Sequence, residues 1–104
     1  MIGSPWEYKN IKVHGLSLSG VRTSFILPQY HLAFDVAQGF SFQLPMRNFF
    51  LTHGHLDHAG GVPFIVSQKA MNSLPTPQFF MPPSLVQPLD QIMKIWQQIE
   101  KHEY

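Results

Sequence analysis

The sequence predicts a mixed α/β fold, and three observations support this prediction. Short segments rich in β-branched and aromatic residues follow one another between Lys12 and Asp35, with turn residues between them. Farther along, strand-like apolar runs alternate with a helical segment. The last twenty residues carry apolar side chains at three- and four-residue spacing. Strands followed by alternating strands and helices indicate layers of sheet and helix around a core.

The first expected strands are residues 12–19, 23–27 and 31–36, which read KVHGLSLS, TSFIL and HLAFDV. The short segments GVR and PQY separate them and contain residues typical of turns. We therefore expect these three segments to form a meander.

The middle of the chain predicts two further strands with a helix between them. Residues 38–46 are expected to be a loop, and the apolar run NFFL at 48–51 has the pattern of a buried central strand. Residues 61–74 are expected to form a short helix interrupted near Asn72 and Ser73. Residues 76–83 then form another short strand between prolines.

The C-terminal segment predicts an amphipathic helix. Its apolar side recurs at three- or four-residue spacing, at Leu85, Leu89, Ile92, Trp96 and Ile99. Two starting points fit the sequence equally well. Ser84 could cap the helix with Gln87 three residues later, or Pro88 could occupy the first helical position.

The composition favours a globular chain of one domain at most. Hydrophobic residues make up 44% of the 104 residues and charged residues 12%, whereas disorder needs low hydrophobicity with high charge. Seven Lys and Arg oppose six Asp and Glu, without the basic stripe that a phosphate backbone attracts. The absence of cysteine excludes disulfides, thiolate metal sites and cysteine nucleophiles. Neither a signal peptide nor a membrane span is visible, so a cytoplasmic protein without membrane contact is expected.

The segment LTHGHLDHAGG at residues 51–61 crowds three histidines and an aspartate together. On an extended backbone His53 and His55 point the same way, while Asp57 and His58 follow where the chain turns into a helix and can serve a second point nearby. Neutral imidazole and carboxylate are ligands that zinc prefers, and two such metals can activate a shared water for hydrolysis. The alternative is a polar loop whose histidines only cap a helix.

The stretch FFLTHGHLDHAGGVPFIVSQ resembles the signature of the metallo-β-lactamase superfamily. The flanks GLSLSGVRTSFILPQYHLAFDVAQG and TPQFFMPPSLVQPLDQIMKIW are similar to the N-terminal part of ribonuclease Z, the tRNA 3′-endonuclease, so the resemblance covers nearly all of residues 12–100. It implies an αββα sandwich of two similar halves with metals in the groove between them. Residues 1–104 would then be a single partial domain, the N-terminal half of such a sandwich.

The resemblance also implies two zinc ions per complete site and a role for each residue of the cluster. His53 and His55 would bind the first zinc, and Asp57 and His58 the second. Asp57 is in addition a candidate for proton transfer at the scissile phosphate.

Two further residues are expected behind the metal ligands. Asp35 matches an acidic residue beneath the metal loop and would fix an imidazole or the loop backbone, although it could equally be a turn residue at a strand end. Thr52 could bond the loop backbone or a carboxylate, and a plain strand-end threonine is the alternative.

The remaining ligands lie on later segments in the family, so the chain would be a shortened form, a natural half or a degenerate member. The leading hypothesis is a zinc-dependent phosphodiesterase of ribonuclease Z type, acting on precursor tRNA or another phosphodiester. One alternative is a related hydrolase of a small ester, lactone or cyclic nucleotide. The other is a non-catalytic fragment that only dimerises or binds metal weakly. A homodimer or a complementary half-domain is expected, with residues 62–65 and the terminal helix as candidate interfaces.

Overall fold

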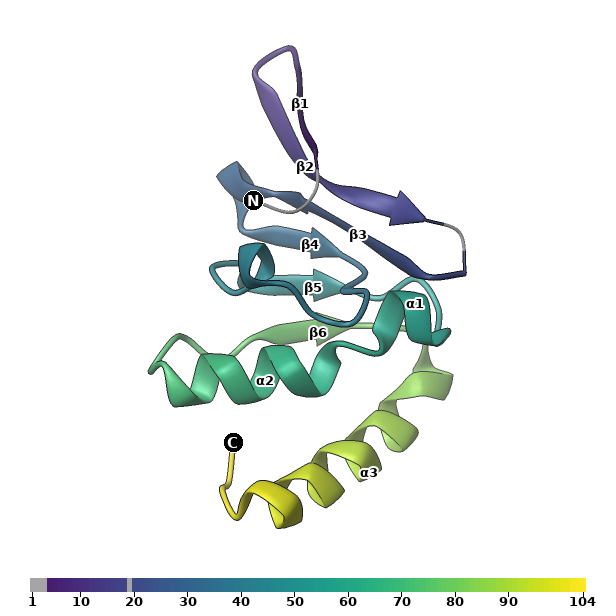
Figure 1. Ribbon diagram of the computed structural model, residues 1–104, viewed down its shortest axis with the longest axis vertical. Coiled ribbons are helices and arrows are strands. Elements are labelled where there is room, and N and C mark those ends of the chain that lie inside the picture. The colour runs from purple at the N-terminus through teal and green to yellow at the C-terminus, as the bar shows by residue number, and fades with distance from the viewer. Residues whose placement is uncertain (1–3, 19) are drawn as a thin grey trace.

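The computed structural model describes residues 4–18 and 20–104, and within them six strands form one mixed sheet in the order of the chain (Figure 1). The strands are β1 (Ser4–Tyr8), β2 (Ile11–Leu18), β3 (Arg22–Leu27), β4 (Leu32–Phe34), β5 (Asn48–Phe50) and β6 (Gln78–Phe80). The helices are α1 (Leu56–Ala59), α2 (Val62–Met71) and α3 (Pro83–Glu100), with short 3-10 turns η1 (Pro28–Tyr30) and η2 (Ser41–Gln43). The predicted α/β class is confirmed.

The sheet changes from antiparallel to parallel pairing at β4. The strands β1 to β4 pair antiparallel, whereas β4, β5 and β6 run parallel with Phe34 opposite Phe50 and Phe50 opposite Phe80. The predicted meander is therefore confirmed as β2, β3 and β4; Ser19, the last residue of its first expected segment, lies outside the described residues. The parallel part places the carboxyl ends of β4, β5 and β6 along one edge of the sheet.

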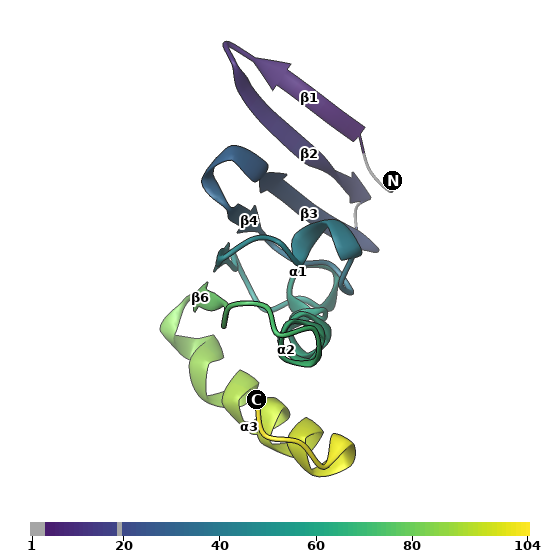
Figure 2. The ribbon, with the colours of Figure 1, turned by 90° about the vertical axis from the view of Figure 1, so that its left-hand side faces the viewer.

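Sequence analysis did not predict β1. It pairs with β2 through a two-residue turn in which Lys9 and Asn10 both have positive φ angles, 49° and 67°. Such turns match the twist of a hairpin, although Asn-Gly is their usual sequence signal. In both ribbon views the hairpin extends beyond the rest of the sheet, away from α3 (Figures 1 and 2).

The core lies between the sheet and α2. Ala33 and Phe49 from the strands meet Val62 and Ile65 from the helix, and all four are buried. Phe79 of β6 stacks on Phe49 with ring centroids 5.0 Å apart. Because Val62 and Ile65 face this core, the expectation that residues 62–65 offer an apolar interface is wrong for these two side chains.

The opposite face of the parallel strands carries a row of phenyl rings. Phe34, Phe50 and Phe80 are register partners, and their rings stack with centroids 5.5 and 4.9 Å apart. Phe34 is 37% exposed and Phe80 47% exposed. We call these three residues the phenyl row, and it leaves apolar surface open on this face.

Helix α3 begins earlier than either predicted start. Pro83 occupies the first helical position and Pro82 precedes it with extended backbone, so Ser84 does not cap the helix and Pro88 lies inside it. Proline suits the first position because its missing N–H would have no partner there. The partly buried side chains Leu85 and Leu89 pack against the core cluster. None of the helices in the described part of the chain has the length and apolar character to cross a membrane.

Helix α2 is joined to the loop beside it by a buried lysine. The Lys69 ammonium donates to the carbonyls of Leu44 and Met46 at 2.8 and 2.7 Å. Burial, together with the positive charge of Arg47, lowers the pKa of Lys69 below its ordinary value of 10.5. The helix expected over residues 61–74 ends at Met71, with Asn72 as its C-terminal cap.

Candidate metal centre

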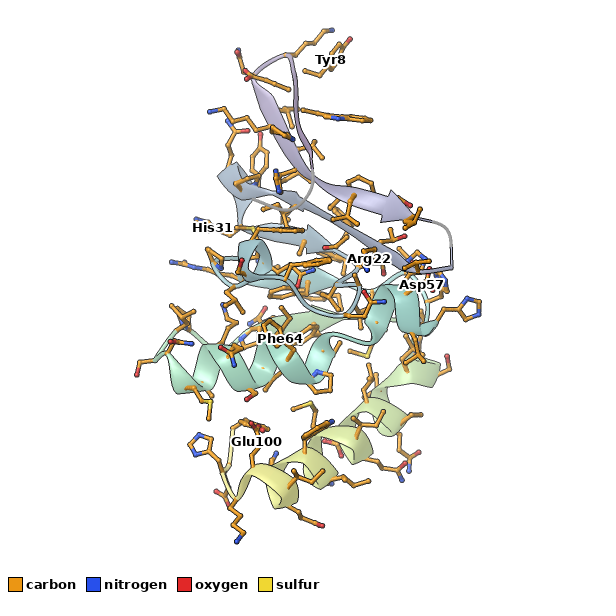
Figure 3. The ribbon with its side chains drawn as sticks, viewed as in Figure 1. Tyr8, Arg22, His31, Asp57, Phe64 and Glu100 are labelled. Carbon is orange, nitrogen blue, oxygen red and sulfur yellow. The ribbon has the colours of Figure 1, made fainter. Side chains whose placement is uncertain are left out.

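The predicted site residues lie where β4 and β5 end. Asp35 follows β4, and Thr52 and His53 follow β5 within a few residues, so the parallel pairing of the two strands brings them together. Figure 3 shows Asp57 on α1, beyond this edge of the sheet. Clefts at the carboxyl ends of parallel strands are the usual place for ligands in α/β sheets.

Asp35 is the hydrogen-bonding centre of the site. It is 4% exposed, and its Oδ1 accepts the backbone N–H of Thr52 at 2.8 Å. Its Oδ2 lies 2.8 Å from the Thr52 hydroxyl and 2.8 Å from Nδ1 of His58. One carboxylate thus joins the end of β5 to the first helix after it.

The backbone at Asp35 is in the left-handed region, with φ of 57°, where aspartate is tolerated better than most residues. A buried polar network fixes this turn. The Ser24 hydroxyl donates to the Asp35 carbonyl at 2.8 Å, and the Gln43 amide donates to the Ser24 hydroxyl at 2.7 Å and to the Val36 carbonyl at 2.8 Å. Both Ser24 and Gln43 are fully buried.

These two positioning residues were missed from the sequence. Gln43 lies in the segment 38–46 that was expected to be a loop, and Ser24 stands in the middle of a strand. Only the burial of both side chains indicates their role, because buried polar groups require partners.

The three imidazoles of the cluster come together. The ring centroids of His53 and His58 are 4.0 Å apart, and those of His53 and His55 are 4.7 Å apart with the rings nearly perpendicular. His55 stands at the N-terminal cap of α1, where its carbonyl accepts the N–H groups of His58 and Ala59 at 2.9 Å. The cap function is therefore carried by the backbone, and no side-chain capping bond is made.

His58 and Asp57 form a second pair of donors. Nε2 of His58 lies 3.2 Å from Oδ2 of Asp57. Two ligands of one tetrahedral zinc, each about 2.0–2.1 Å from it, lie about 3.3 Å apart, so this separation suits a shared ion.

The side chains of the cluster lie in pairs. In the described part of the chain, no group of three or more His, Asp or Glu side chains is arranged to hold an ion. Two pairs are available instead, His53 with His55 and His58 with Asp57. A catalytic zinc requires three protein ligands, so neither pair is a complete ligand set by itself.

Close packing around the cluster depends on glycine. A Cβ atom on Gly61 would lie 2.3 Å from the backbone nitrogen of Gly39, and one on Gly54 would lie 2.6 Å from the Leu85 side chain. The absence of a side chain at these two glycines lets the turn after β4 and the start of α3 approach residues 51–61 closely.

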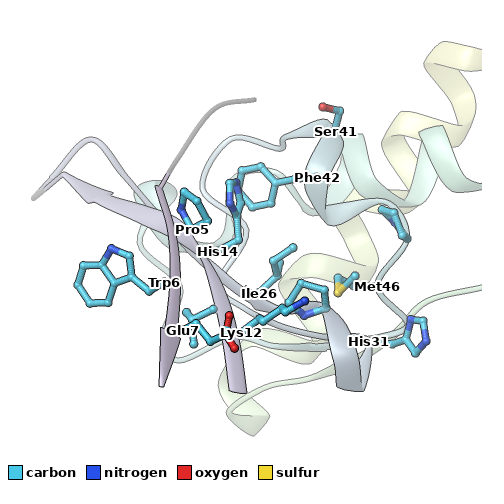
Figure 4. Close-up of a pocket in the computed structure, with 13 residues that line it drawn as sticks. Pro5, Trp6, Glu7, Lys12, His14, Ile26, His31, Ser41, Phe42 and Met46 are labelled. Atoms are coloured by element: carbon cyan, nitrogen blue, oxygen red, sulfur yellow. The ribbon is translucent and has the colours of Figure 1, made fainter. Parts of the chain in front are cut away.

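A cavity of about 870 Å³ lies elsewhere (Figure 4). It is lined by the β1–β2 hairpin and the loop around η2, with Trp6, Phe42 and Met46 among its apolar walls. The buried His14 ring meets Phe42 there edge to face. None of the predicted site residues lines this cavity.

The sequence matches no family model. It is 32% identical over 89 residues to the chloroplastic tRNase Z TRZ2 of Arabidopsis thaliana, covering 86% of this chain and 25% of that protein. It is 25% identical over 97 residues to tRNase Z TRZ1 of the same plant, covering 93% of this chain and 35% of that protein. It is 29% identical over 97 residues to the nuclear ribonuclease Z of Triticum aestivum, covering 93% of this chain and 55% of that protein.

The chain thus spans between a quarter and about half of the length of these curated relatives. The resemblance to ribonuclease Z expected from the sequence motifs is confirmed, and over most of its own length this chain is similar to proteins named tRNase Z.

Proposed function

We propose that this chain supplies the N-terminal half of a metallo-β-lactamase-type domain and, with it, half of a zinc-dependent phosphodiesterase site of ribonuclease Z type. The observation that carries the proposal is the convergence of three imidazoles at the carboxyl end of β5, with centroids no more than 4.7 Å from that of His53. Similarity to proteins named tRNase Z supports precursor tRNA as the substrate.

Each side chain of the cluster has a distinct task in this proposal. His53 and His55 bind one zinc, and His58 and Asp57 bind the other. When bound, such a pair of ions lowers the pKa of a water and stabilises charge on a phosphate. Asp57 also accepts or returns a proton at the scissile phosphodiester. Asp35 lies behind the ligands and orients His58.

The missing ligands come, in this proposal, from a second half-domain that packs on the phenyl row. Phe34 and Phe80 are more than a third exposed, and aromatic rings in register on one sheet face are suited to a second sheet. A second copy of the chain or a complementary segment would provide that sheet. Either partner would cover the open side of the site and supply the bridging ligand that a paired metal site requires.

Arg22 favours a phosphodiester over a neutral ester or lactone. It begins β3, and because β3 runs antiparallel to β4 it lies at the edge where β4 and β5 end. Its Nε is buried without a hydrogen-bond partner in the described structure. A guanidinium is the side chain best suited to bind a phosphate group.

The competing function is a non-catalytic fragment that binds metal weakly or only dimerises. The specific observation in its favour is that the described residues offer donors only in pairs. Pairs of ligands bind zinc less tightly than a closed set of three or four.

Zinc content and hydrolysis separate these functions. The 104-residue chain is loaded with zinc and assayed on a precursor tRNA, bis-p-nitrophenyl phosphate and p-nitrophenyl acetate. Cleavage of the first two substrates, abolished by His55→Ala and retained in the matched exposed variant His31→Ala, supports the phosphodiesterase. Arg22→Ala should raise the KM for precursor tRNA and leave hydrolysis of the acetate ester unchanged. A metal-free, inert dimer would favour the fragment.

A further inference from the structure

One carboxylate, Asp35, is connected to two imidazoles of the cluster by different routes. The route to His58 is direct, from Oδ2 to Nδ1 at 2.8 Å. The route to His53 passes through the Thr52 hydroxyl, which lies 2.8 Å from the same Oδ2 and 2.9 Å from Nδ1 of His53.

The directions of these hydrogen bonds follow from counting hydrogens. The backbone N–H of Thr52 donates to Oδ1 of Asp35, and an ionised carboxylate can only accept. The Thr52 hydroxyl and Nδ1 of His58 must therefore both donate to Oδ2. A protonated Asp35 would have to donate its own hydrogen to one of the groups that contact it, and that group could then not donate to the carboxylate.

A threonine hydroxyl has a single hydrogen. Because Thr52 donates this hydrogen to Asp35, its Oγ1 can only accept from His53, and Nδ1–H of His53 is the donor of that bond. His53 then carries its hydrogen on Nδ1, as His58 does.

We infer that Thr52 is a positioning residue that connects the Asp35 carboxylate to the His53 ring by hydrogen bonds. His53 and His58 are thereby fixed as the Nδ1–H tautomer, in which Nε2 carries a lone pair and no hydrogen. Within residues 4–18 and 20–104 no hydrogen bond is made to a His55 ring nitrogen, so this ring is not fixed in the same way. Thr52 therefore does more than bond a neighbouring carboxylate. Its hydroxyl determines which ring nitrogen of His53 carries the hydrogen and which one presents a lone pair.

The inference rests on the proposed function only for the use of these tautomers in metal binding, because the tautomers themselves can be measured without metal. A metal ligand must present a lone pair, and a hydrogen bond at the other ring nitrogen sets which one does so. Two rings fixed in advance lose less freedom when an ion binds than rings that exchange tautomers.

Nitrogen chemical shifts measure the tautomers directly without metal. The 104-residue chain is labelled with 15N, treated with a chelator and studied by long-range 1H–15N correlation at about pH 8.5, well above the reference pKa of about 6.5 for imidazole in model peptides. His53 and His58 should show the Nδ1–H pattern. Thr52→Val should move His53 to the Nε2–H form that free imidazole side chains prefer, with His58 unchanged, and Thr52→Ser should restore His53.

A wild-type His53 with its hydrogen on Nε2, or a His53 tautomer that Thr52→Val does not change, overturns the inference. Backbone amide spectra establish that each variant is folded, and the unchanged His58 acts as an internal control. Thr52→Ser is the matched variant, because it keeps the hydroxyl and loses only a methyl group.

Zinc titration of the same variants separates this inference from the proposed function. If both are correct, Thr52→Val weakens zinc binding about 10-fold or more relative to Thr52→Ser. If the tautomers behave as expected and wild-type chain binds no zinc, the proposed function fails and the inference stands. If zinc binds and Thr52→Val leaves the tautomer of His53 in place, the inference fails and the proposed function stands.

Discussion

Replacing Gln43 by Met should destabilise the fold more than any surface substitution of the same chemistry. The Gln43 side chain is fully buried and makes three hydrogen bonds, to the Ser24 hydroxyl, to the Val36 carbonyl and from the Phe40 N–H, at 2.7 to 2.8 Å. Each net bond contributes about 1 kcal/mol, and the Phe40 N–H loses this partner. Methionine fills a similar volume, so the expected loss is about 2–4 kcal/mol in the free energy of unfolding.

Urea unfolding of the wild-type chain and Gln43→Met measures this loss, with Gln91→Met as the matched control on an exposed position of α3. The control should change the free energy by no more than about 0.5 kcal/mol. Ser24→Ala and the double variant complete a cycle, in which shared bonds predict a coupling of about 0.5–3 kcal/mol. A loss below about 1 kcal/mol for Gln43→Met, without coupling to Ser24, would show that the turn at Asp35 does not depend on this network.

Three further substitutions test the packing and the electrostatics of the fold by urea unfolding. Pro88→Ala should stabilise α3 by about 1–3 kcal/mol, since it removes a proline from inside the helix, whereas Pro83→Ala at the first helical position should change stability by less than about 0.5 kcal/mol. Gly61→Ala should cost about 1–3 kcal/mol, because the new Cβ would overlap a neighbouring backbone. Lys69→Met should cost about 2–3 kcal/mol at neutral pH through the two carbonyls that lose a charged donor. Because burial lowers the pKa of Lys69, the unfolded chain binds its proton more strongly, and the wild type should gain stability relative to Lys69→Met as pH rises toward 10.5. Equal free energies of unfolding for the two proline variants would contradict the first argument. A Gly61→Ala variant as stable as the wild type would contradict the second. A stability difference between the wild type and Lys69→Met that does not change with pH would contradict the third.

The close grouping of the side chains in residues 51–61 was the part of the site best predicted from the sequence, because these residues are local in the chain. His53, His55, Asp57 and His58 lie within six residues, so strand alternation followed by a helix start is enough to bring them near one another. Their roles as ligands stay a prediction.

Long-range burial was the part that the sequence could not predict. Gln43 is nineteen residues from Ser24 along the chain, and only the packing of η2 against β3 makes the two side chains partners. Likewise β1 contains Pro5 and Glu7, which are depleted in strands, and pairing with β2 overrides that preference.

The predicted starts of α3 were wrong because two local sequence signals for a helix start competed. A serine followed three residues later by glutamine is a familiar cap signal, and proline at the first position is another. Pro83 satisfies the second signal five residues before Pro88, and Pro82 before it is extended at φ −56° and ψ 141°. Pro88 is then tolerated inside the helix without determining where it begins.

The two margins of the sheet differ in how readily another polypeptide can extend it. Strand β6 is three residues long, with Pro77 just before it and Pro82 shortly after it, and proline lacks the N–H that an added strand would need. Strand β1 is longer and presents the exposed rings of Trp6 and Tyr8. Its one proline, Pro5, lies near its start, and the three residues that follow keep their backbone N–H groups. Strand pairing between molecules, including that in early aggregates, should therefore extend the sheet from β1 and not from β6.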